Sequence, residues 1–88
     1  MKPVALLKAI GGKIRVIRKS KELSQEKLAE LSSLHPTFVS NLENGKLNGS
    51  ILSYYRIAEA LDTPLAKLFT ISPVSKPASK AKRTKKKT

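Results

Sequence analysis

Apolar residues recur at helical spacing along most of the chain, and no stretch alternates as a half-buried strand would. The first stretch predicts a helix from about Pro3 to Lys19 with an inward stripe, made of Leu6, Leu7, Ile10, Ile14 and Ile17. Gly11 and Gly12 interrupt it, and each weakens a helix by about 1 kcal/mol relative to Ala. Two interpretations follow: one continuous helix, or a break that separates a short leader from the domain.

Residues 24 to 45 hold two short helical patterns joined by a tight turn. Ser24 stands where a cap accepts backbone N–H groups, and one face of the first helix is marked by Leu28, Ala29 and Leu31. The second helix follows Pro36, whose missing N–H is harmless in a first turn, and its apolar positions are Phe38, Val39 and Leu42. Leu34 lies in the connection and can be buried between the helices. This is the layout of a helix-turn-helix, whose second helix enters the major groove of DNA.

Two more helices are predicted after the motif. Gly45 ends the preceding helix as a left-handed cap. Ser50 caps a helix over residues 51 to 61, with an inward face made of Leu52, Tyr55, Ala58 and Leu61, while Tyr54 is expected at the edge or in a subunit contact. Thr63 and Pro64 begin a short fifth helix that runs through Phe69. The predicted fold is therefore all-α with five helices.

Polar side chains remain outward on the second helix of the motif, at Thr37, Ser40, Asn41 and Asn44. Thr37 and Asn41 lie one turn apart, so both can point into a major groove. Asn can pair bidentately with adenine, and Thr offers a hydroxyl and a methyl group. For Ser40 the alternative is that its small size only lets the helix approach the DNA backbone.

The flanks of this helix supply further candidate contacts. Gln25 opens the first helix of the motif, where its side chain and exposed backbone N–H groups would meet a phosphate, or where it is an ordinary solvent-facing residue. Lys46 and Asn48 are phosphate contacts or part of a solvated loop. His35 is expected to cap the recognition helix or to touch a phosphate. The predicted DNA-binding set is Gln25, His35, Thr37, Phe38, Ser40, Asn41, Asn44, Lys46 and Asn48.

Composition argues against catalysis and metal binding. The chain has no Cys and one His, so it offers no thiolate ligand and no cluster for a zinc or catalytic centre. We expect no enzyme activity, no cofactor and no metal. Lys8 interrupts the apolar start, and no stretch reaches the length of a membrane span, so we expect a cytoplasmic, nucleoid-associated protein.

Positive charge is concentrated at the C-terminal end. The chain has 18 Lys plus Arg and 6 Asp plus Glu, a net charge of +12. All six acids and eleven bases precede residue 72, giving 11 − 6 = +5, and the other 18 − 11 = 7 bases lie in residues 72–88. This segment has no acids and no apolar periodicity, which predicts a disordered cationic arm after a domain of residues 1–71. We expect the arm to bind DNA without choosing its sequence.

The sequence resembles the Cro and phage-repressor family, the xenobiotic-response-element (XRE) type of helix-turn-helix regulator. Residues IGGKIRVIRKSKELSQEKLAELS resemble its first two helices, and FVSNLENGKLNGSILSYYRIAEALDTPLAKLF its third to fifth, so the likeness covers Ile10 to Phe69. The resemblance implies a sequence-specific transcriptional regulator, a repressor, that binds double-stranded DNA as a homodimer with half-sites about 34 Å apart. It also implies a partly buried ion pair between Arg18 and Glu43.

Two positions depart from the family pattern. Many relatives read a base with a polar side chain where this chain has Pro36, so readout is expected to shift to Thr37, Asn41 and His35. The turn usually carries Gly where this chain has Ser33, which adopts a left-handed conformation at a cost of about 1 kcal/mol.

The homodimer contact is expected at the fifth helix, through Leu65, Leu68 and Phe69, although part of this set must also close the monomer core. Two alternatives to a simple repressor remain open. One is an antitoxin that also neutralises a toxin protein. The other is a bridging, nucleoid-type protein that binds DNA mainly through its basic tail.

Overall fold

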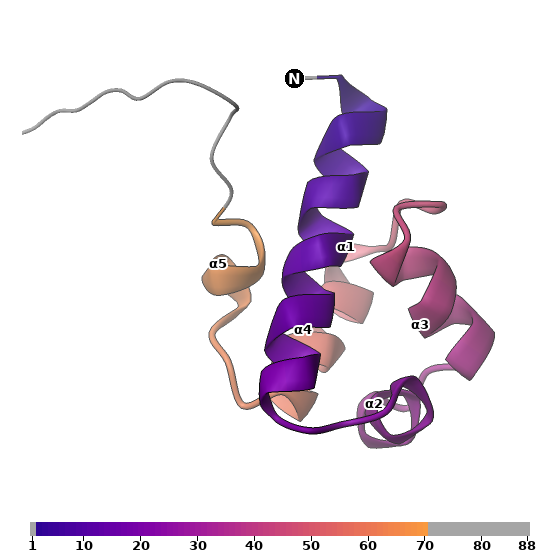
Figure 1. Ribbon diagram of the computed structural model, residues 1–88, viewed down its shortest axis with the longest axis vertical. Coiled ribbons are helices and arrows are strands. Elements are labelled where there is room, and N and C mark those ends of the chain that lie inside the picture. The colour runs from indigo at the N-terminus through magenta and orange to yellow at the C-terminus, as the bar shows by residue number, and fades with distance from the viewer. Residues whose placement is uncertain (1, 71–88) are drawn as a thin grey trace, which may run out of the picture.

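The computed structural model describes residues 2–70, which contain five α-helices and, among these residues, no strand (Figure 1). The helices are α1 (Pro3–Ser20), α2 (Gln25–Ser32), α3 (Pro36–Glu43), α4 (Ile51–Ala60) and α5 (Leu65–Leu68). The predicted all-α, five-helix fold is confirmed. The lysine-rich tail, residues 72–88, lies outside the described residues.

The helices pack in an interleaved order. α1 lies against α3 and α5, α2 lies against α3 and α4, and α4 also contacts α5. Their shared core consists of Ile10, Ile14, Ile17, Leu28, Ala29, Val39, Leu42, Tyr54, Ile57, Ala58, Leu61 and Leu68. Leu34, in the turn between α2 and α3, packs against this core as the sequence indicated.

The long first helix passes through Gly11 and Gly12 without interruption, so the interpretation of a break is wrong. A Cβ atom on Gly11 would lie 2.4 Å from the carbonyl oxygen of Leu42 and 2.5 Å from that of Glu43. A Cβ atom on Gly12 would have nothing within 4 Å. Gly11 is therefore the point where α1 and α3 cross at backbone contact, and Gly12 has no such role.

The predicted inward face of α4 is only half correct, since Ala58 and Leu61 are buried as expected but Leu52 and Tyr55 are not. Tyr54, Ile57, Ala58 and Leu61 are buried, whereas Leu52 and Tyr55 are 57% and 46% exposed. The predicted residues are spaced three apart. On a helix of 3.6 residues per turn, each such step falls roughly 60° short of a full turn, so the predicted residues move around the helix and away from one face. The observed spacing of three, four and seven residues follows the helix instead.

The two adjacent tyrosines consequently have opposite environments. Tyr54 packs edge-on against Phe69, with ring centroids 5.4 Å apart, and its hydroxyl accepts a hydrogen bond of 3.3 Å from the Gly49 N–H. The Tyr55 hydroxyl instead donates to Glu59 Oε2 at 3.0 Å on the surface. This hydrogen bond, reinforced by the carboxylate charge, raises the pKa of Tyr55.

Two other leucines expected to face inward are exposed. Leu6 lies at the edge of α1, and Leu31 points away from the core on α2. Ser32 takes the inward position beside Leu28 and Ala29, and its hydroxyl donates to the Leu28 carbonyl oxygen at 2.7 Å. A polar residue is tolerated there because a backbone carbonyl satisfies its hydroxyl group.

The predicted caps and turns are confirmed, although the fifth helix is shorter than expected and spans only Leu65–Leu68. The hydroxyl oxygens of Ser24 and Ser50 accept from the N–H groups of Lys27 and Ser53, at 2.9 and 3.1 Å. Ser33 is left-handed, with φ 60° and ψ 38°, and Gly45 has φ 70°. The turn between α2 and α3 therefore has the left-handed conformation expected at Ser33.

Candidate DNA interface

A buried ion pair joins the first helix to the end of the third, as the resemblance implied. Arg18 Nε donates to Glu43 Oε2 at 2.6 Å and Nη2 to Oε1 at 3.1 Å, with side chains only 9% and 0% exposed. Arg18 Nη1 also donates to the Leu23 carbonyl oxygen at 2.7 Å. One guanidinium thus ties α1, the entry to α2 and the end of α3 together.

The same carboxylate attracts two more side chains. Gln25 Nε2 donates to Glu43 Oε1 at 3.0 Å, so its nitrogen is turned toward the protein. Arg15 Nε lies 3.6 Å from the same oxygen, and Arg15 Nη2 donates to Asn44 Oδ1 at 2.6 Å. Sequence reasoning missed Arg15. Its position three residues before Arg18, nearly one helical turn, is the signal that would have found it.

The start of α3 is fixed by His35, the only histidine in the sequence. His35 Nδ1 accepts from the Thr37 N–H at 3.1 Å, which confirms the predicted cap. Because Nδ1 is the acceptor, the neutral ring carries its hydrogen on Nε2, which leaves a donor for an incoming group. Pro36 occupies the first turn, as expected.

The structure distributes the predicted contact residues unevenly. Five of them are exposed, namely His35, Thr37, Asn44, Lys46 and Asn48. Gln25, Ser40 and Asn41 are half-buried. Phe38 is also half-buried and packs against the core, so less of its surface remains for DNA. These nine residues remain predicted contacts, carried by the start of α2, by α3 and by the loop that follows.

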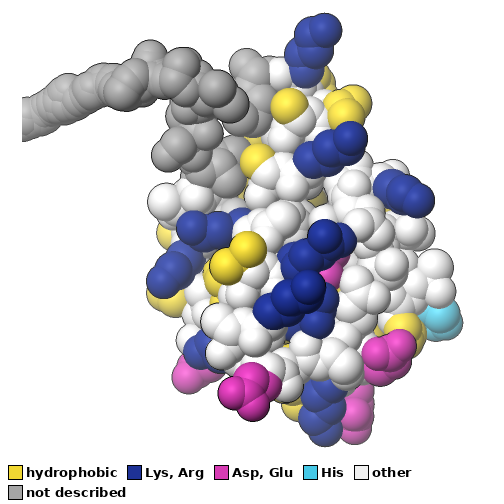
Figure 2. Space-filling model, viewed as in Figure 1, with side chains coloured by type: hydrophobic (Ala, Val, Ile, Leu, Met, Phe, Trp, Pro, Cys, Tyr) yellow, Lys and Arg dark blue, Asp and Glu magenta, His cyan; other side chains and the backbone are white. Residues whose placement is uncertain are grey.

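The outer face of α3 is polar but carries no exposed charge. Its one charged residue, Glu43, is buried in the ion pair. The other acids of residues 2–70 are exposed on α2, on α4 and in the turns, at Glu22, Glu26, Glu30, Glu59 and Asp62. Figure 2 shows acidic side chains gathered at the lower end of one face, with Lys and Arg spread more widely. The outer face of α3 is therefore suited to hydrogen bonding with the edges of DNA bases, while Lys and Arg side chains beside the helix can hold the phosphates.

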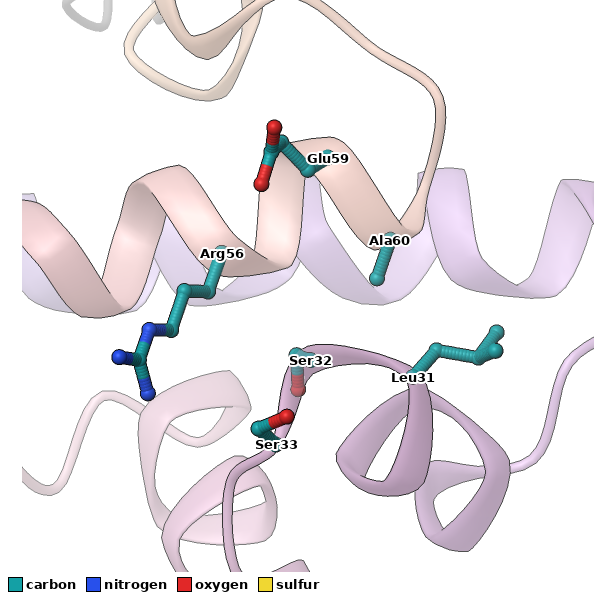
Figure 3. Close-up of a pocket in the computed structure, with 6 residues that line it drawn as sticks. All are labelled: Leu31, Ser32, Ser33, Arg56, Glu59 and Ala60. Carbon is teal, nitrogen blue, oxygen red and sulfur yellow. The ribbon is translucent and has the colours of Figure 1, made fainter.

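Hollows also lie elsewhere on the described surface, and two of them are well defined by their lining. One, of about 520 Å³, lies between the end of α2 and α4, with Arg56 and Glu59 on one side and Ser32 and Ser33 on the other (Figure 3). The other, of about 330 Å³, is an apolar groove between α1 and the start of α4, where Leu6, Ile51 and Phe69 meet. Within residues 2–70 no three His, Cys, Asp or Glu residues come together as metal ligands. None of the helices in this range combines the length and apolarity that crossing a bilayer requires.

Two short helices joined through a left-handed turn, the second one presenting polar side chains outward, define a helix-turn-helix DNA-binding domain. The family model described as helix-turn-helix matches residues 14–68. The chain belongs to this family of DNA-binding transcription regulators.

Several relatives are control proteins. The chain is 39% identical over 57 residues to control protein C.SmaI of Serratia marcescens, a match that covers 65% of this chain and 68% of that protein. It is 39% identical over 61 residues to control protein C.MunI of a Mycoplasma species, covering 68% and 82%. Among solved structures, the restriction-modification controller protein C.AhdI from Aeromonas hydrophila superposes with a TM-score of 0.73 at 40% identity, covering 74% of this chain and 98% of that one.

Proposed function

We propose that the protein represses transcription by binding a two-fold operator as a homodimer, with α3 in the major groove. The observation that carries this proposal is the outer face of α3, which is polar, free of exposed charge and fixed to α1 through Glu43. Thr37 is exposed and Asn41 half-buried on this helix, and both side chains are of types that hydrogen-bond base edges. The likeness to control proteins favours restriction-modification genes as the regulated targets.

The test is whether α3 reads sequence. An operator is selected from random duplexes, and Thr37→Ala and Asn41→Ala are measured on that operator and on a scrambled duplex. We expect each substitution to weaken operator binding by about 1 to 3 kcal/mol and to spare the scrambled duplex. Asn48→Ala, in the loop after α3, is the control and should weaken both duplexes equally. If each substitution weakened binding to the operator and to the scrambled duplex equally, Thr37 and Asn41 would contact only the DNA backbone.

The homodimer surface is proposed at the fifth helix and the groove beside it. Leu68 is fully buried in the monomer, so Leu65 and Phe69 are the members of the predicted set that keep accessible surface. The groove extends this surface, because Phe69 lines it together with Leu6 and Ile51. Burying exposed apolar side chains of this kind is the usual driving force for self-association.

A matched pair of substitutions tests this surface, because Ile51 and Val16 are both 67% exposed and only Ile51 lines the groove. Ile51→Glu should yield a monomer in light scattering after gel filtration, since it buries a charge in the contact. Val16→Glu should leave the dimer intact. If both variants were dimers, the contact would lie elsewhere on the surface. If the unsubstituted protein were a monomer at every concentration tested, the homodimer would be removed from the proposal.

The basic segment after Ser72 is proposed to add affinity for any duplex. If about four of its seven bases engage phosphates, ending the chain at Ile71 should make the slope of log K against log salt shallower by roughly 3 to 4. The preference for operator over scrambled DNA should hardly change. Loss of that preference would favour the nucleoid-type alternative, in which the tail does most of the binding.

A further inference from the structure

Asn44, the C-cap residue that follows α3, is held by a side chain from another helix. Arg15 Nη2 donates to Asn44 Oδ1 at 2.6 Å, while Arg15 Nε faces Glu43 Oε1 at 3.6 Å. The guanidinium is thus held by one hydrogen bond to Asn44 and by the charge of the Glu43 carboxylate beside it. Arg15 still has 42% of its side chain exposed, so its charge is accessible from solvent.

This contact determines which way the Asn44 amide points. A guanidinium has only donors, so the amide must turn its oxygen toward Arg15 and its nitrogen away. Asn44 is exposed, and across residues 2–70 we find no protein acceptor for Nδ2. Two N–H groups are therefore presented outward beside the helix that is proposed to enter the groove.

The end of α3 needs outside help to accept an anion. A helix C-terminus carries partial negative charge, which repels phosphate, and the last turn of α3 contains no basic residue. Arg15 supplies the missing positive charge from α1, directly behind the outward amide. Charge and donor together make a position that suits a DNA backbone phosphate.

We propose that Arg15 is a positioning residue for DNA binding: it holds the Asn44 amide so that Nδ2 donates to a backbone phosphate. This inference rests on the proposed function, since it requires α3 to lie on DNA. A phosphate contact carries no sequence information, so its loss should weaken operator and scrambled duplexes alike. That signature separates it from the contacts of Thr37 and Asn41.

The Asn44 series separates DNA binding from stability. Asn44→Asp keeps an acceptor for Arg15 but replaces the outward N–H groups with a second anionic oxygen. The thermal midpoint should stay near that of the unsubstituted protein, while affinity for both duplexes falls by about tenfold to a hundredfold. Asn44→Ala should also lower both affinities by about tenfold, without adding a charge. Unchanged affinity of Asn44→Ala would overturn the proposal.

A double-substitution cycle tests whether Arg15 acts through Asn44. Arg15→Ala should lower affinity about tenfold alone and only about twofold once Asn44→Ala is present. Arg15→Lys, which keeps the charge but has a single donor nitrogen, should recover part of the loss. Independent, multiplicative effects of the two alanine substitutions would overturn the positioning role. If the unsubstituted protein bound no duplex, the proposed function would fail with it. If it bound the operator and the Thr37 and Asn41 results held, only this inference would be in question.

Discussion

The third and fifth helices are attached to the rest of the molecule in opposite ways. α3 meets α1 at backbone contact beside Gly11 and is fastened by the buried Arg18–Glu43 pair. α5 has four residues and one fully buried side chain, Leu68, with Phe69 packed edge-on against Tyr54 next to it. The first attachment depends on exact atom positions, whereas the second depends on apolar area. Base reading needs donors held in place, and subunit contact tolerates repacking.

The largest expected effect is at the ion pair. Glu43→Ala should lower the free energy of unfolding by about 3 to 5 kcal/mol, because it strands the buried Arg18 charge. Glu30→Ala is the control, since it breaks the exposed Lys27–Glu30 pair, which is worth under about 1 kcal/mol. Urea denaturation measures both. A Glu43→Ala midpoint equal to that of the control would show that α3 is not held by this pair.

The α5 attachment should be weaker. Leu68→Ala is expected to lower the free energy of unfolding by about 2 to 3 kcal/mol, at the low end for a buried leucine, because a four-residue helix can shift to close the cavity. The same denaturation experiment, together with light scattering, reports the effect on folding and on the dimer. A loss larger than that of Glu43→Ala would reverse the comparison.

The two adjacent glycines sharpen the contrast further. Gly11→Ala should destabilise by about 1 to 3 kcal/mol, because its Cβ would overlap two carbonyl oxygens of α3. Gly12→Ala should stabilise by about 1 kcal/mol, since it gains helix propensity and meets no neighbour. Opposite signs in thermal unfolding are the expected result. Equal shifts for the two variants would show that α1 and α3 can separate without loss.

The smallest effect is expected at the turn between α2 and α3. Ser33 is left-handed, a conformation that glycine adopts without strain, so Ser33→Gly should stabilise by about 1 kcal/mol or less. Ser32→Gly, one residue earlier in the buried end of α2, should destabilise instead. If both glycine variants raised the thermal midpoint, the gain could not be assigned to the left-handed backbone angle of Ser33 alone.

The sequence predicted what depends on near neighbours. Ser24, Ser50, Ser33 and Gly45 cap or turn the chain as expected, because each acts on backbone a few residues away. The Arg18–Glu43 pair came from family resemblance, and its burial is confirmed.

What depends on distant partners was missed or wrong. Gly11 and Gly12 look alike in sequence, and only the position of α3 distinguishes them. Because Tyr54 and Tyr55 are adjacent, the pattern of α4 allows either to face inward; the prediction chose Tyr55, whereas Tyr54 is buried. Arg15 meets Asn44 across a separation of 29 residues, which no local pattern records.

The interleaved packing of the helices also bears on how the chain is made. Because α2 lies on α4 as well as on α3, part of its apolar face is covered by a helix that comes later in the chain. A nascent chain that has released α3 from the ribosome still lacks the α4 surface that covers α2. The helix that supports α3 is therefore fully covered only after α4 has emerged, and fragments that stop before residue 51 should be targets for proteases rather than weak DNA binders.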